Sequence, residues 1–70
     1  MSYGKHERLV NTEWAGGFKA GEAVTHQQRD AHVLAVPAEK IPPGEVPIMY
    51  DDESGGFVTV PADDLEKRIN

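Results

Sequence analysis

The sequence predicts a mainly β fold, with one small barrel or bent antiparallel sheet of four or five short strands. The first observation is that short runs of β-branched, apolar and aromatic residues recur about every ten residues, with Gly, Pro or Asp between them. The second is that no helical pattern of apolar residues continues for about ten residues. The third is length, because 70 residues form one small domain and hairpins need no long crossover connection.

Residues 1–17 are predicted to form a flexible N-terminal arm, extended or only partly ordered, ahead of a β domain at residues 18–70. The stretch "HERLVNTEW" fits a strand and a helix equally well, and a Gly-Gly pair then interrupts either pattern. Trp14 is expected to dock on the domain, and a frayed terminus is the alternative of equal weight.

The first predicted hairpin joins a short alternating strand at residues 22–26 to an apolar strand at residues 33–36. The polar segment "QQRD" between them has the length of a hairpin connection. The second strand holds the most apolar run of the chain, so we expect it to be the central strand. Pro37 is expected to end it, because proline cannot donate to the hydrogen-bond ladder.

A second hairpin follows the Pro/Gly-rich loop "EKIPPGE", whose Pro-Pro-Gly sequence suits a tight turn. Its first strand is "EVPIMYD", its turn "DESGG" and its returning strand "FVTVP". In the first strand, Val46, Ile48 and Tyr50 alternate with Pro47 and Met49. Because Pro47 has no N–H, we expect one side of this strand to be an edge or a bulge.

The C-terminal segment is predicted to form a short helical turn. Asp63 is a candidate N-cap, with Glu66 three residues later as in a capping box. Acidic residues then lie at the start of the helix and basic residues at its end, the order that its dipole favours. Leu65 and Ile69 share a face that can pack on the sheet.

Two motifs give the chain a family resemblance. "KAGEAV" is similar to the glycine-acid-x-valine opening of many small barrels, and "VPADDL" is similar to the valine-proline and helical turn before their last strand. Over residues 18–66 the sequence therefore resembles the SH3-like small β-barrel superfold. The resemblance implies a fold class and the binding of macromolecules, which is common among such barrels, but no particular ligand. The Ala-Leu-Tyr-Asp-Tyr opening and tryptophan pair of peptide-binding SH3 domains are missing, since Trp14 lies outside the barrel region.

The composition argues against several function classes. The net charge is −5, and residues 51–70 hold six acidic side chains against two basic ones, so a basic surface for nucleic acid is not expected. There is no cysteine, which removes disulfides and thiolate chemistry and favours a reducing, cytoplasmic setting. No apolar run has the length of a membrane span, and residues 1–8 do not lead into a signal-peptide core.

Candidate chemistry is sparse. His26 and His32 flank the first hairpin connection, but a zinc site needs three or four ligands, and Asp30 is the only carboxylate between them. The acidic turn at residues 51–53 lacks the spacing of a calcium loop. No phosphate loop is present, and a barrel of this size has little room for a water-excluding pocket. We therefore expect no enzyme activity, no metal and no cofactor.

Large side chains are the remaining candidates for function. A small core does not hold every aromatic and methionine side chain, so some are expected to form a protein-docking face or an exposed strand edge. A simple Tyr50–Phe57 cross-strand pair is the alternative of equal weight. The expected partner-binding residues are Trp14, Phe18, Pro47, Met49, Tyr50 and Phe57, with Asp51, Asp52 and Glu53 as an acidic rim.

The sequence thus predicts a small acidic protein-binding module, acting as an adaptor, modulator or inhibitor on a protein partner or on itself. An accessory nucleic-acid-binding barrel is one alternative, with Lys19, Arg29 and Lys40 as its basic stripe. A structural subunit of a larger assembly, such as a phage or secretion complex, is the other.

Overall fold

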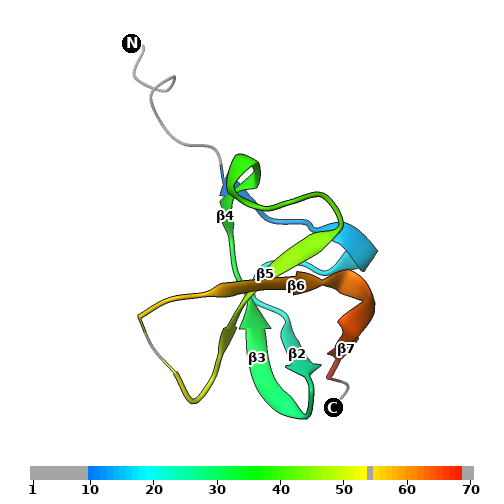
Figure 1. The fold of residues 1–70 in the computed structure, drawn as a ribbon, viewed down its shortest axis with the longest axis vertical. Helices are drawn as coiled ribbons and strands as arrows, with labels where there is room; N and C mark the ends of the chain where they lie inside the picture. Colours follow the sequence, from blue (N-terminus) through cyan, green and yellow to red (C-terminus); the bar gives the residue numbers. More distant parts are fainter. Residues whose placement is uncertain (1–9, 54, 69–70) are drawn as a thin grey trace.

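A computed structural model describes residues 10–53 and 55–68. In it the chain forms a curled, all-antiparallel sheet of five strands, a half-barrel, together with a separate two-strand sheet (Figure 1). The strands are β1 (Val10–Asn11), β2 (Ala23–His26), β3 (Arg29–Val33), β4 (Val36–Pro37), β5 (Glu45–Tyr50), β6 (Val58–Pro61) and β7 (Leu65–Lys67). The large sheet has the order β6-β5-β3-β2-β7, and β1 pairs with β4. The predicted mainly β fold is confirmed.

Three one-turn 3-10 helices connect these strands, and the described residues contain no α-helix. They are η2 (Ala15–Gly17), η3 (Ala38–Lys40) and η4 (Ala62–Asp64). The β1–β4 sheet lies at one end of the molecule and the turn of the β2–β3 hairpin at the other (Figure 1). No helix in the described ranges combines the length and apolar character needed to cross a membrane.

The β2–β3 hairpin is tighter than predicted. Arg29 pairs with His26, so the connection is the two residues Gln27 and Gln28 and not the four residues "QQRD". Both glutamines have positive φ, at 52° and 70°, as in the type I′ turn that matches the twist of two-residue hairpins. The turn therefore adopts a backbone that its side chains do not favour.

The predicted central strand at residues 33–36 is wrong in its position. The central strand is β3, which ends at Val33, and Leu34 and Ala35 lie between strands. Val36 belongs to β4 and pairs with Asn11. The physical reason is alternation, because β3 buries every second side chain and leaves polar ones between them, whereas the apolar run leaves the sheet.

The β5 strand begins at the predicted residue and ends one residue earlier than predicted, at Tyr50, but the edge expected at Pro47 is wrong. β5 pairs with β3 on one side and β6 on the other, and Pro47 is fully buried. The Leu34 N–H donates to the Pro47 carbonyl at 3.0 Å, where the β3–β5 pairing ends. The indole Nε1 of Trp14 donates to the Leu34 carbonyl at 2.8 Å, so a side chain supplies the donor that proline lacks.

The C-terminal segment has a shorter helical turn than predicted. η4 occupies one turn, its N-cap is Pro61 with no side-chain cap hydrogen bond, and residues 65–67 then form β7. The capping role expected for Asp63 is therefore wrong. Leu65 is buried as expected, but it pairs with His26 as a strand residue. Ile69 lies outside the described residues. The chain extends after η4 because the edge of β2 offers a ladder that a helix cannot use.

The core fills the curl of the half-barrel, and part of the predicted arm belongs to it. The buried apolar side chains are Trp14, Phe18, Val24, Ala31, Val33, Ile41, Val46, Ile48, Val60 and Leu65. Trp14 thus docks on the body, and η2 packs against η4, where a Cβ on Gly16 would lie 3.2 Å from that of Ala62. Residues 1–9, the rest of the predicted arm, lie outside the described residues.

Candidate functional site

The predicted aromatic face is divided between the core and the surface. Trp14, Phe18 and Pro47 are buried and are not available for docking in this conformation. Their burial follows from the fold, because the segment before β2 covers the end of the half-barrel where Pro47 lies. Met49 and Tyr50 are half-buried, and Phe57 is 42% exposed.

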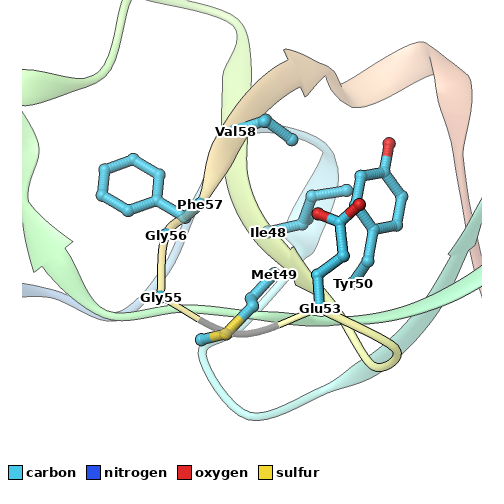
Figure 2. Close-up of a pocket in the computed structure, with 8 residues that line it drawn as sticks. All are labelled: Ile48, Met49, Tyr50, Glu53, Gly55, Gly56, Phe57 and Val58. Carbon is cyan, nitrogen blue, oxygen red and sulfur yellow. The ribbon is translucent and has the colours of Figure 1, made fainter.

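Met49, Tyr50 and Phe57 line one shallow hollow of about 250 Å³ at the β5–β6 hairpin (Figure 2). The other lining residues are Ile48, Glu53, Gly55, Gly56 and Val58. Ile48 pairs with Val58, which puts Met49 across from Phe57 at the next position. Phe57 and Tyr50 point in opposite directions, so the Tyr50–Phe57 pair, the alternative to a docking face, is not formed (Figure 2).

Tyr50 connects three elements of the sheet. Its hydroxyl lies 2.7 Å from the Nδ1 of His26 on β2, and His26 is 7% exposed. The guanidinium of Arg29 on β3 lies over the Tyr50 ring, 3.7 Å from its centroid, in cation–π geometry. The phenol thus satisfies a buried imidazole nitrogen and supports a cation, a structural role for a residue expected to bind a partner.

The acidic rim is held by basic side chains of the sheet. The Nη2 of Arg29 donates to Asp52 at 2.9 Å and to Glu53 at 3.1 Å. The hydrogen bond to Asp52, followed by that to Glu53, holds the pKa of Arg29 above its usual range. Because these groups are in solvent, each ion pair contributes little stability. Arg29 is therefore engaged by two carboxylates, which leaves it less available for the alternative role of binding phosphates.

Asp51 has its own partners on the neighbouring strands. It lies 2.7 Å from the Nδ1 of His32, and its second oxygen lies 3.4 Å from the Nη2 of Arg68. The hydrogen bond with His32 is the main cause that holds the pKa of Asp51 below its usual range, and Arg68 adds to it. Arg68 also donates to the carbonyls of Val24 and Ala31, at 3.2 and 2.9 Å.

The two histidines are not brought together. His26 pairs with Arg29 beside the turn, whereas His32 pairs with Ala23 at the far end of the hairpin. His26 faces Tyr50 inside the sheet and His32 faces Asp51 at the surface. In the part of the chain that the structure describes, no three His, Asp or Glu side chains converge in a group that could hold a metal ion.

The outer side of β6 is the feature that sequence reasoning missed. β6 is the last strand of the sheet, and its pairing within the described residues is with β5. Val58 is 43% exposed beside the exposed Phe57, so two large apolar side chains stand at an unpaired strand edge. Alternation in "FVTV" places Val58 on the same face as the buried Val60, so the sequence carries no signal for this exposure.

Comparison with known proteins adds no assignment to this site. No protein-family model matches the sequence, no curated protein matches it, and no solved structure matches the chain. The candidate site is therefore defined by its geometry alone: the outer edge of β6, the exposed side chains of Phe57 and Val58, and the acidic groups at the ends of the strand.

Proposed function

We propose that this chain is a non-enzymatic protein-binding module and that its binding surface is the outer edge of β6. The observation that carries the proposal is a coincidence of two features. An edge strand of the half-barrel has an unpaired side within the described residues. That strand begins with Val58 and directly follows Phe57, two of the exposed large apolar side chains. Backbone hydrogen bonds would give affinity in such a site, and apolar side chains would add buried area.

The edge is short, as expected for a strand that must avoid indiscriminate pairing. Pro61 ends β6 and has no N–H to offer to a neighbour. The segment available for pairing is thus residues 57–59, which is long enough to bind one extended segment and too short to propagate a larger sheet. This geometry supports selective strand addition over aggregation.

The finer fold assignment belongs to the same proposal. "KAGEAV" leads into β2, and "VPADDL" spans the end of β6, η4 and the start of β7. β7 follows a one-turn helix, which is the order that the resemblance to the SH3-like small barrels implies for a last strand, and it pairs with β2. Such barrels have many functions, so this likeness supports macromolecular binding only as an analogy.

The experiment compares matched surface variants in capture of partner proteins. The immobilised chain is exposed to lysate from its native source, with and without nuclease treatment, and retained proteins are quantified by mass spectrometry. Val58→Ser removes an apolar side chain at the edge, and Val10→Ser is its control, because Val10 is 48% exposed and lies on β1, outside the five-strand sheet.

We expect wild type and Val10→Ser to retain the same partner protein in equal amounts, and Val58→Ser to lose it. A partner retained equally by all three variants would place the binding surface elsewhere. Retention that nuclease abolishes would favour a nucleic-acid-bridged interaction and would overturn the proposal.

A further inference from the structure

We infer that the β6 edge binds an extended segment of a partner protein that carries basic side chains on both sides of an apolar residue. This inference rests on the proposed function and names the chemistry of its ligand. It is argued from three features: the backbone groups that face outward, the distribution of charge around the strand, and the apolar surface between the charges.

The backbone groups that face outward follow from the hydrogen-bond pattern. The Pro47 carbonyl accepts from Leu34, so the backbone polar groups of Pro47 point toward β3. Thr59 is the partner of Pro47 on β6, and a residue in such a non-hydrogen-bonded antiparallel pair directs its own N–H and C=O away from the shared ladder. Those of Thr59 therefore point outward, and Phe57, two residues earlier, repeats this direction. Together they offer two donors and two acceptors to an added strand.

The chain segment that contains β6 carries charge of one sign. Residues 41–65 contain six acidic side chains and no lysine, arginine or histidine. Asp52 and Glu53 precede β6, and Asp63 and Asp64 follow it in η4, all four exposed. Arg29 alone bridges Asp52 and Glu53, so that pair keeps a net negative charge. Within the described residues, no basic side chain forms an ion pair with Asp63 or Asp64.

Apolar surface lies between these two acidic groups. Phe57 lies just before β6, Val58 is its first residue, and both line the hollow together with Met49 (Figure 2). A segment with basic residues at its ends would place them near the carboxylates. It would also place an apolar residue against Phe57 or Val58, whose side chains lie on opposite faces of the strand (Figure 2). Complementary charge of this kind steers association and fixes the register of the added strand.

A second copy of the chain fits this edge less well. Pairing β6 with β6 would bring the two sets of acidic groups into the same small area. Repulsion between exposed charges persists over a screening length of about 8 Å at physiological salt, so acidic groups brought that close would oppose the pairing. Like charges disfavour such a pairing, whereas a basic segment gains from the same field.

The test is a titration of the full chain with three synthetic peptides, in which binding is measured by isothermal calorimetry or fluorescence anisotropy. The first is the acetylated, amidated nonapeptide with the sequence KVKVTVKVK. The second has every lysine replaced by glutamate. The third keeps the lysines but carries N-methyl groups on alternate residues, which blocks strand pairing without changing charge. Thr59→Pro supplies the same block from the protein side, since it removes an N–H that faces outward and leaves the β5 ladder intact.

The lysine peptide is expected to bind at least about tenfold more tightly than the glutamate peptide, with affinity falling as salt rises. The N-methylated peptide and the Thr59→Pro variant should each lose binding, and the peptide result stands even if the variant does not fold. Equal binding of the lysine and N-methylated peptides would show charge attraction without strand addition and would overturn the inference.

The two proposals can fail separately. If neither lysine nor glutamate peptide binds but Val58→Ser still abolishes partner capture, the basic ligand is wrong and the binding module stands. If neither peptide binds and Val58→Ser captures the same partner as wild type, both the basic ligand and the binding surface at the β6 edge are wrong. Concentration-dependent dimerisation that Thr59→Pro abolishes would identify a second copy as the occupant and would contradict the basic segment.

Discussion

The indole of Trp14 donates a 2.8 Å hydrogen bond to the carbonyl oxygen of Leu34, where the antiparallel ladder of β3 and β5 meets a proline. In a regular ladder, the residue opposite Leu34 would supply this donor. That residue is Pro47, which accepts from Leu34 but has no N–H to return. A side chain from before the first strand of the half-barrel therefore completes the sheet, and the predicted arm is tied to the body by this bond.

The first prediction concerns the Trp14 indole N–H, which takes the place of the N–H that Pro47 lacks. Trp14→Phe should destabilise the fold, because it leaves the Leu34 carbonyl without a donor and reduces core packing. Pro47→Ala restores an N–H opposite Leu34, so the loss caused by Trp14→Phe should be smaller in that background. A double-mutant cycle from urea unfolding should show a coupling free energy of about 0.5–1 kcal/mol. Additive effects would mean that the two groups do not serve the same acceptor.

The second prediction concerns the phenol of Tyr50. Tyr50→Phe keeps the ring beneath Arg29 and removes the oxygen that lies 2.7 Å from the buried His26. The free energy of unfolding should fall by about 1–2 kcal/mol, because the His26 imidazole nitrogen loses its hydrogen-bond partner at a site shielded from water. Phe57→Leu is the control, since that ring is exposed and should matter little to stability. Equal stability of Tyr50→Phe and wild type in chemical denaturation would contradict the role given to this hydroxyl.

The third prediction concerns the turn between β2 and β3. Gln27 and Gln28 both have positive φ, which asparagine and glycine adopt more readily than glutamine. Replacing the pair with Asn-Gly should therefore raise the free energy of unfolding by about 1 kcal/mol. Replacing both with alanine should give no such gain. A destabilised Asn-Gly variant, measured by thermal and urea unfolding, would show that the turn differs from the one described.

The fourth prediction concerns acid stability. The pKa of Asp51 is lowered in the folded chain, chiefly by its hydrogen bond with His32. The unfolded chain thus takes up this proton first as pH falls below the ordinary aspartate value of about 3.9. The stability due to Asp51 is present above that pH and is lost as pH drops through the lowered value.

Asp51→Asn should therefore show a shallower loss of unfolding free energy than wild type as pH falls below about 4. His32→Asn should reduce the same slope, because it removes the principal partner of the carboxylate. Urea unfolding at a series of pH values checks both. A wild-type slope retained by Asp51→Asn would mean that this carboxylate gains no stabilisation in the fold.

Several elements of the fold could be predicted from local chemistry. The β2 and β5 strands follow from alternation and β-branched residues, and the short turn after Pro61 follows from the residues around it. Local signals could not place Val33–Val36 correctly, because an apolar run has the same composition whether it crosses a sheet or leaves it. The two-glutamine turn was equally hidden, since neither residue is typical of positive φ.

The candidate site was less predictable, for a reason that depends on tertiary pairing. Trp14, Phe18 and Pro47 are large or special residues, and composition alone cannot say which of them the core will hold. Val58 is a strand residue like Val60, yet one is exposed and the other buried. That difference depends on where β6 lies in the sheet, and strand order is set by contacts distant in sequence. Phe57 is the one predicted aromatic that the structure leaves well exposed.

The most direct measurement of the central claim is amide hydrogen exchange by NMR with and without the saturating lysine peptide. The amides of Val58 and Val60 face β5 by the strand alternation and should be protected in both states. The amides of Phe57 and Thr59 face outward, so they should exchange fast in the free protein and slowly in the peptide-bound protein. Bound peptide that leaves the Phe57 and Thr59 amides in fast exchange would contradict strand addition at β6.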